Sequence, residues 1–383
     1  IQDRMFRKNG ELFYPGFPSD PFWADFITGE GLENEEVPKP SALAEFFGDH
    51  MVVNGLIWPK AIVEPRNYRI RLLNGCDSRF LVVRFRAVPT GATDLEEASM
   101  PLPFHVIGSD QGLAASATLT DTLVHEPGGR YDLIFDFKGM QGLRIIMENI
   151  GGDAPFGGPF GEALDEEDLF PDRQTDRIMA FDVEEIANVP DGFDPSAIGP
   201  WAGNNRPVIN TRKVALFEGN DEYGRLQPLL GTAEPTVDVD GNLVDGAIAW
   251  HSPTTENPQL APDSAEIWEI YNATGDAHPV HLHLVKFEIL DRQLFAADMV
   301  EQPVVQHNGA NGTGFRLENI DLGPVLPPLP AYVENAPKDM VTALPGQVTR
   351  IKTTFDKPGR YVWHCHILSH EDHEMMRVLQ VGI

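Results

Sequence analysis

The sequence is poor in cysteine, in basic residues and in long apolar runs. Only Cys76 and Cys365 occur among 383 residues, too few for a disulfide framework. Basic residues number 29 against 58 acidic ones, and the net charge of −29 disfavours nucleic acid and anionic membranes as partners. No run of about 18 consecutive apolar residues occurs, so the sequence predicts no membrane span. Disulfide-rich, nucleic-acid-binding and membrane-spanning classes are therefore excluded.

Helical periodicity is also scarce. Short runs rich in β-branched and aromatic residues recur instead, separated by Gly, Pro, Asn and Asp, which is the pattern of an all-β protein. The 32 Pro and 35 Gly provide the many turns that sandwiches or Greek-key barrels need. The clearest predicted strands are residues 51–54, 68–73, 80–85, 131–137, 266–271, 285–290, 348–355 and 360–366.

A domain boundary is predicted at residues 185–210. This stretch contains four prolines, several Gly and Asn, and no sustained apolar alternation. The length of the chain allows two or three domains of roughly 150 residues each. We therefore predict one β-domain at residues 1–184, a linker at residues 185–210 and a second β-domain at residues 211–383.

The histidines are concentrated in two short segments. Three of the twelve lie within residues 278–283, and four lie within residues 364–373. Side chains on a strand alternate between its faces, so His364 and His366 are expected to point one way and Cys365 the other. One strand can thus serve two metal sites on opposite sides, an arrangement with no obvious structural use.

The residues after Cys365 complete a recognisable ligand set. His370 lies five residues beyond the cysteine and Met375 ten residues beyond it, in a loop that can wrap around one ion. With a second histidine this is the His₂Cys trigonal set with a weak axial Met, which holds blue copper for electron transfer. The sequence therefore predicts a copper site.

The second histidine of this site is predicted to be His278. His281 and His283 lie two residues apart, so on a strand they share the opposite face. Pro279 is expected to bend the chain between the two roles. The remaining candidates are interpreted as packing or surface residues: His50, His105, His125, His251, His307, His373 and Met376.

The segments HPVHLHLVKFEILDR (278–292) and WHCHILSHEDHEMMR (363–377) resemble the multicopper oxidases, within them the bilirubin oxidase and bacterial spore-coat laccase branch. The likeness extends to GDHMVVNGLIWPKAIVEPRNYRIRLLNG (48–75) and to further segments along the chain. The resemblance implies two cupredoxin-like Greek-key β-barrel domains, corresponding to the second and third domains of the family.

The resemblance also implies a role for each candidate ligand. The type 1 copper site, which takes electrons one at a time from substrate, is matched by His278, Cys365, His370 and Met375. The type 2 copper is matched by His281. The type 3 pair is matched by His283, His364 and His366.

Two carboxylates are matched as well. Glu371 corresponds to an acidic residue that helps to move protons to the oxygen site. Asp339 resembles a position near the type 1 copper and is a candidate for supporting a ligand there. The implied reaction couples one-electron oxidation of small phenolic or tetrapyrrole substrates to four-electron reduction of O2 to water.

The family's trinuclear cluster uses eight histidines, four of them from a first domain with two further HxH-type motifs. This chain has no third HxH, and residues 1–15 resemble an internal strand and turn. We therefore expect the first β-domain to lack its opening strands, and an N-terminal cupredoxin fragment of the same enzyme to be the partner that supplies the other histidines. The location stays unknown, with an extracellular, periplasmic or spore-surface one favoured.

Three other functions remain open. The chain alone holds one complete copper site, so it could be a copper-binding electron-transfer protein without oxidase activity. A copper nitrite reductase is also built from cupredoxins, but there the imidazoles flanking Cys365 would lack a purpose. A metal oxidase acting on Mn(II) or Cu(I) fits the acidic surface, although no Met-rich insert supports the Cu(I) variant.

Overall fold

The structure is a computed structural model that describes residues 1–20, 37–92, 95, 97–184 and 191–382. Strands predominate in this part of the chain, and its one α-helix is the short α2 (Leu368–Asp372). Each of the predicted strands overlaps an observed strand, so the all-β class is confirmed. No helix among these residues is long and apolar enough to cross a membrane.

The chain divides into two compact units, and neither is one continuous stretch. Unit 1 comprises residues 1–13, 47–202 and 329–338. Unit 2 comprises residues 14–46, 203–328 and 339–383. The change from unit 1 to unit 2 at residues 202/203 falls inside the predicted linker 185–210, of which residues 185–190 lie outside the described part. Each unit thus includes a segment distant in the sequence, which the contiguous ranges 1–184 and 211–383 do not capture.

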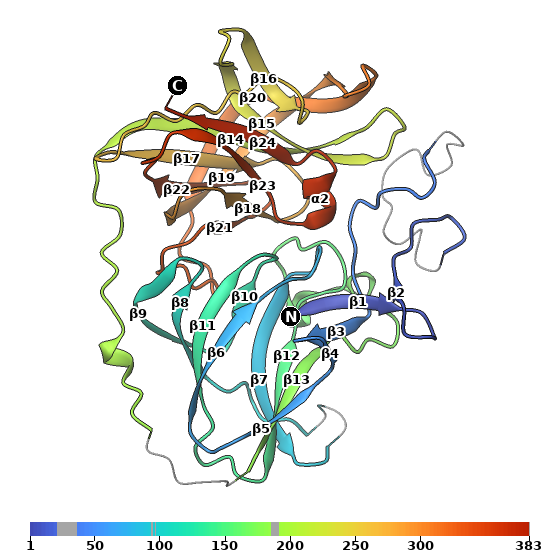
Figure 1. Ribbon diagram of the computed structural model, residues 1–383, viewed down its shortest axis with the longest axis vertical. Helices are drawn as coiled ribbons and strands as arrows, with labels where there is room; N and C mark the ends of the chain where they lie inside the picture. Colours follow the sequence, from blue (N-terminus) through green and yellow to red (C-terminus); the bar gives the residue numbers. More distant parts are fainter. Residues whose placement is uncertain (21–36, 93–94, 96, 185–190, 383) are drawn as a thin grey trace. The chain divides into compact units, whose positions relative to one another are not determined.

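Unit 1 contains three antiparallel or mixed sheets (Figure 1). The five-stranded sheet has the order β10 (Leu123–His125), β7 (Leu81–Pro89), β12 (Leu143–Asn149), β13 (Arg177–Val183) and β5 (Lys60–Val63). A four-stranded sheet has the order β6 (Asn67–Leu73), β11 (Arg130–Asp136), β8 (Phe104–Ser109) and β9 (Gly112–Thr120). A small sheet has the order β2 (Leu12–Phe13), β1 (Gln2–Phe6), β3 (His50–Val53) and β4 (Leu56–Ile57). Three 3₁₀ turns are η1 (Gly161–Ala163), η2 (Glu166–Asp168) and η3 (Pro195–Ala197).

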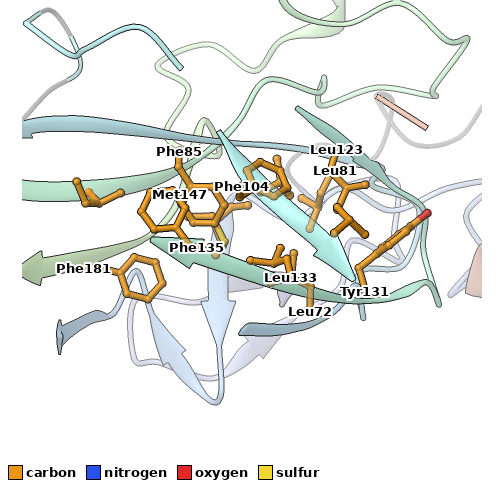
Figure 2. Close-up of a cluster of buried hydrophobic side chains, with 14 of the residues drawn as sticks. Leu72, Leu81, Phe85, Phe104, Leu123, Tyr131, Leu133, Phe135, Met147 and Phe181 are labelled. Carbon is orange, nitrogen blue, oxygen red and sulfur yellow. The ribbon is translucent and has the colours of Figure 1, made fainter. Parts of the chain in front are cut away.

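The core of unit 1 is rich in aromatic rings (Figure 2). On β7, the fully buried Leu81, Val83 and Phe85 occupy every second position and therefore point into the same core cluster. The ring of Phe85 lies 4.5 Å from that of Phe135 and 5.3 Å from that of Phe104, measured between centroids. Burial of such a side chain is worth about 1.5–3 kcal/mol, so these rings contribute substantially to the stability of unit 1.

The described residues of unit 2 form two sheets (Figure 1). The larger has the order β16 (Leu243–Ile248), β15 (Leu226–Val237), β14 (Val208–Asn220), β17 (Ala265–Asn272), β22 (Gln347–Thr353), β19 (Phe287–Val305) and β20 (Asn311–Val325). The smaller has the order β21 (Met340–Ala343), β18 (His278–Leu282), β23 (Gly359–Cys365) and β24 (Met376–Val381). Trp268 of the first sheet and Trp363 of the second are fully buried and pack edge to face, with centroids 5.6 Å apart. The smaller sheet carries both histidine-rich segments.

Candidate metal centre

The register between β18 and β23 arranges the histidines on the two faces of one sheet. The strands are antiparallel neighbours, with Val280 opposite Cys365 and His281 opposite His364. Because successive side chains point to opposite faces, Cys365 joins the buried core together with Val280. His281 and His364 therefore meet on the other face, as the alternation of residues 364–366 predicts.

The inner face carries a compact group of three donor atoms. The Sγ of Cys365 lies 3.6 Å from Nδ1 of His278 and 3.8 Å from Nδ1 of His370. The two Nδ1 atoms lie 3.3 Å apart. All three side chains are buried. We call His278, Cys365 and His370 the inner group, and its donors are close enough together for one ion to contact all three.

The loop after Cys365 brings Met375 to this group. The backbone N–H of Cys365 donates to the carbonyl of Met375, and the N–H of Met375 donates to the carbonyl of His370, both at 3.0 Å. The Met375 side chain is fully buried in the core cluster that contains Cys365. Met376 begins β24 opposite His364 and is only half-buried. The structure therefore favours Met375 over Met376 as the neighbour of the inner group.

Polar side chains lie behind the two imidazoles, and one of them is hydrogen-bonded to a ring nitrogen. The Nε2 of His278 lies 2.8 Å from Oγ1 of Thr274 and 3.8 Å from a carboxylate oxygen of Glu218. The Nε2 of His370 lies 3.7 Å from a carboxylate oxygen of Glu45. The Thr274 hydroxyl accepts from Nε2 of His278, which leaves the Nδ1 lone pair of this ring directed at the sulfur. Sequence reasoning missed all three supporting residues, and only Thr274, four residues before His278, is close enough in the chain to have been considered.

Burial keeps both imidazoles of the inner group neutral. It lowers the pKa of His278 to about 3. Burial, and then the neighbouring His278 and His373, lower the pKa of His370 well below its usual value. Cys76 and Cys365 are both free thiols, so Cys365 is available as a ligand. Two neutral imidazoles, one cysteine sulfur and a buried methionine are the donor set of a blue-copper site, and the residues present fit copper.

The outer face carries a second group, formed by His281, His283 and His364, whose ligand atoms lie within 4.8 Å of one another. The Nε2 atoms of His283 and His364 are 3.1 Å apart. The ring of His366 lies at the margin, with its centroid 5.7 Å from that of His364 and 6.1 Å from that of His281. We call His281, His283, His364 and His366 the outer group. Burial lowers the pKa of His281 to about 4, so this ring is neutral at neutral pH.

Pro279 does not separate the two groups. The strand β18 runs without interruption from His278 to Leu282, and Pro279 is paired with Thr342 of β21. The separation results from ordinary strand alternation, in which His278 and Val280 face the core while His281 faces away. The expectation of a bend at Pro279 is wrong, because the period of a strand already places these histidines on opposite faces.

Asp339 lies beside the outer group. Its main-chain carbonyl accepts a hydrogen bond from Nδ1 of His281 at 2.7 Å, and its carboxylate lies 3.7 Å from the same nitrogen. Met340, the next residue, is directly opposite His281 in the β18–β21 pair, which fixes this placement. A carbonyl can only accept, so Nδ1 carries the proton and Nε2 keeps its lone pair. This differs from the expected position of Asp339 near the type 1 residues.

Glu371 contacts the outer group from the helix α2. Its Oε2 lies 3.0 Å from Nδ1 of His364. Burial raises the pKa of Glu371, but the hydrogen bond from His364 and the nearby imidazoles outweigh it and hold the pKa below its usual value. Glu371 is therefore a carboxylate at neutral pH. The adjacent His373 points elsewhere, with Nε2 3.6 Å from a carboxylate oxygen of Asp221.

Comparisons with known proteins agree with this geometry. Residues 227–383 match the family model described as multicopper oxidase. Over its whole length the chain is 33% identical to a laccase of Bacillus subtilis, and over 89% of its length it is 30% identical to a bilirubin oxidase of Albifimbria verrucaria. The crystal structure of the McoA multicopper oxidase from Aquifex aeolicus superposes on the entire chain with a TM-score of 0.60 at 20% identity.

The relatives are longer than this chain. It spans 61% of the Bacillus laccase and 49% of the bilirubin oxidase, and it covers 64% of the McoA structure. The structural likeness confirms the expected cupredoxin-like domains. Residues 227–383, which the family model matches, include every member of the inner and outer groups.

Proposed function

The chain belongs to the multicopper oxidase family, and on this premise we propose that it is the copper-bearing part of a laccase- or bilirubin-oxidase-like enzyme. In this proposal, four one-electron oxidations of phenolic or tetrapyrrole donors supply the electrons that reduce one O2, with four protons, to two waters. The observation that carries it is the pair of donor groups on opposite faces of β23, linked through Cys365. Copper, when bound, supplies one-electron redox chemistry at the inner group and oxygen-reducing chemistry at the outer group.

The inner group is proposed to hold the type 1 copper. His278, Cys365 and His370 supply the three strong donors, and Met375 supplies a weak fourth one. Their complete burial excludes water, so the coordination stays the same as the charge of the site changes. Thr274 restrains the ring of His278 from behind through a hydrogen bond, and loss of such a partner typically costs 10–100-fold in metal affinity.

Cys365 connects the inner group to the outer group. His364 and His366 flank it in the chain, so a path of covalent bonds runs from its sulfur to an imidazole on either side. The carbonyl of Cys365 also accepts a hydrogen bond from Nδ1 of His364 at 2.9 Å, which shortens this path. This arrangement supports electron passage from the face that receives electrons to the face where O2 is reduced.

Glu371 is proposed to deliver protons to the outer group. Its carboxylate touches Nδ1 of His364, and 26% of its side chain is exposed to solvent. A carboxylate between solvent and a buried imidazole can accept a proton from one side and release it on the other. Asp339 is proposed to act by positioning, because its carbonyl fixes the tautomer of His281 so that Nε2 faces the outer group.

The outer group is proposed to bind the type 2 and type 3 coppers jointly with another segment. His281 is assigned to the type 2 copper, and His283, His364 and His366 to the type 3 pair. These four imidazoles are half of the family's set of eight. The partner proposed to supply the other four is an N-terminal cupredoxin fragment of the same enzyme, consistent with the greater length of the relatives.

Copper stoichiometry and oxygen uptake test this proposal. The 383-residue chain alone is expected to bind about one copper tightly and to consume no O2, whereas its complex with the N-terminal cupredoxin fragment should bind about four and consume O2 with a phenolic donor. In the complex, His364→Ala should stop O2 consumption and leave the blue colour in place. Full O2 reduction by the isolated chain would overturn the shared cluster. A blue complex that consumes no O2 would support the electron-transfer alternative.

A further inference from the structure

Two exposed histidines outside the inner and outer groups lie against each other in unit 2. The rings of His251 and His307 are 5.7 Å apart between centroids and nearly perpendicular, at 76°. His251 follows β16, whereas His307 lies in the turn between β19 and β20. Both side chains are exposed, so the fold has brought together two imidazoles that it does not need for its core.

The loop that carries the first of these histidines is tied to the segment around Met375. The backbone N–H of Trp250 donates to a carboxylate oxygen of Glu374 at 2.5 Å. The guanidinium of Arg377 donates to the carbonyl of Ala249 at 3.2 Å and also to the carbonyl of Pro253. The loop is therefore held on both sides of His251, because the side chains of Glu374 and Arg377 bond to its backbone.

The turn that carries His307 is equally well supported. The N–H of Gln306 donates to the carbonyl of Ala310 at 2.8 Å, and the buried amides of Gln306 and Gln227 bond to each other at 2.9 and 3.0 Å. Asn308 donates to a carboxylate oxygen of Glu222 at 2.7 Å. These bonds hold the turn against the connection between β14 and β15.

This connection is itself joined to the segment that supplies the inner group. Asp221, the residue before Glu222, lies 3.6 Å from Nε2 of His373, and the N–H of His373 donates to the carbonyl of His370 at 3.2 Å. Two turns of unit 2 thus contact residues 370–377, and the turn that carries His307 is bonded to one of them. The histidine pair stands at the edge of the segment that holds two of the four proposed type 1 ligands.

We propose that His251 and His307 form a surface site for a divalent transition-metal ion. Imidazole nitrogen suits Ni²⁺, Cu²⁺ and Zn²⁺, whereas Mg²⁺ and Ca²⁺ prefer oxygen ligands. The nearby carboxylate of Glu222 and the net charge of −29 raise the local concentration of cations. The exposure of both rings leaves room for water to complete the coordination, so the ion exchanges readily with solution. This site does not depend on the proposed oxidase function.

The test uses tag-free, copper-loaded protein and Ni(II) as the probe. In calorimetry the unchanged protein should bind one Ni(II) more than the His251→Ala or His307→Ala variant, because any Ni(II) held by the outer group is common to all three. Ni(II) should also quench the fluorescence of the exposed neighbour Trp250. His251→Ala and His307→Ala should each weaken binding by about tenfold or more, because each removes one of two protein ligands. Their unfolding transitions should match that of the unchanged protein, since both side chains are exposed.

Two control variants sharpen the assignment. His50→Ala removes a histidine of unit 1 that is hydrogen-bonded to Asp49 at 2.6 Å, and it should leave the Ni(II) isotherm unchanged. Trp250→Phe should remove the quenching and retain the calorimetric binding, which would place the ion beside residue 250. An unchanged isotherm in either His251→Ala or His307→Ala would overturn the site.

Discussion

The two units bury polar groups in different ways. In unit 1 the ammonium of Lys338 is fully buried, 3.0 Å from a carboxylate oxygen of Asp110 and 3.1 Å from one of Glu126. Burial alone would lower the pKa of Lys338, but these carboxylates hold it well above its usual value. The charges in this core are therefore neutralised by other groups of the protein.

Unit 2 places only electron-pair donors against one another at its inner group. His278, His370 and Cys365 approach to 3.3–3.8 Å, and both imidazoles are neutral at neutral pH. Such a group lacks the positive charge that Lys338 supplies in unit 1. In the proposed function a metal cation provides it, so the buried polar group around Lys338 needs no ligand from solution whereas the inner group does.

The largest expected effect follows from removing the sulfur of the inner group. Cys365→Ser should abolish the intense visible absorption of copper-loaded protein together with substrate oxidation, because both depend on the thiolate donor. Cys76→Ser is the matched control, since Cys76 is the other buried free thiol and lies in unit 1. Visible absorption spectra of the two copper-loaded variants test this prediction. A blue Cys365→Ser protein would show that the inner group is not the type 1 site.

Breaking the ion-pair network around Lys338 in unit 1 should change only the stability of the protein. Lys338→Met leaves Asp110 and Glu126 buried without their cation, which should cost about 3–5 kcal/mol in the free energy of unfolding of unit 1. Lys138→Met, which removes a solvent-exposed partner of Asp136, should change the free energy of unfolding far less, because solvent screens this ion pair. Denaturant unfolding measures both. An equal effect of the two variants would refute the contrast between the units.

A smaller effect is expected at the axial position. Met375→Leu should retain copper and raise its reduction potential, because loss of a weak donor destabilises the oxidised ion more than the reduced one. Met376→Leu, one residue further on and half-buried, should leave the potential unchanged. Electrochemistry on the two variants compares them directly. A shift for Met376→Leu alone would reassign the ligand.

The features that could be predicted from the sequence are those that depend on local periodicity. Strand alternation has a period of two, so the opposite directions of Cys365 and His364 followed from their adjacency alone. The same reasoning separated His278 from His281, and it made the additional bend at Pro279 unnecessary.

The features that could not be predicted depend on contacts between distant segments. Glu45 lies 3.7 Å from His370 because residues 37–46 belong to unit 2, and nothing in the local pattern of residues indicates this. Likewise, the placement of Asp339 beside His281 depends on the register between β21 and β18. A sequence motif indicates candidate ligands, whereas the residues that contact them from behind are set by tertiary structure.

The smallest effect concerns an ion pair at the edge of a sheet in unit 1, and it depends on pH. Asp182 of β13 accepts two hydrogen bonds from Arg144 on the adjacent β12, at 2.6 and 3.0 Å, and one from Lys60 of β5 at 2.9 Å. The hydrogen bonds from Arg144 are the main cause that lowers the pKa of Asp182 to about 2.

A carboxyl whose pKa is depressed by folding stabilises the folded protein above its unfolded pKa of about 3.9, and this contribution disappears as the pH falls towards 2. Asp182→Asn should therefore destabilise unit 1 at pH 6 by about 1 kcal/mol or less, since Lys60 is largely exposed to solvent. The difference between the two proteins should shrink below pH 4, as measured by denaturant midpoints from pH 6 to pH 2.5. Asp136→Asn, at a more exposed ion pair, is the control and should change the midpoint little at any pH. A difference for Asp182→Asn that stays constant down to pH 2.5 would mean that Arg144 acts on this carboxyl through packing and not through charge.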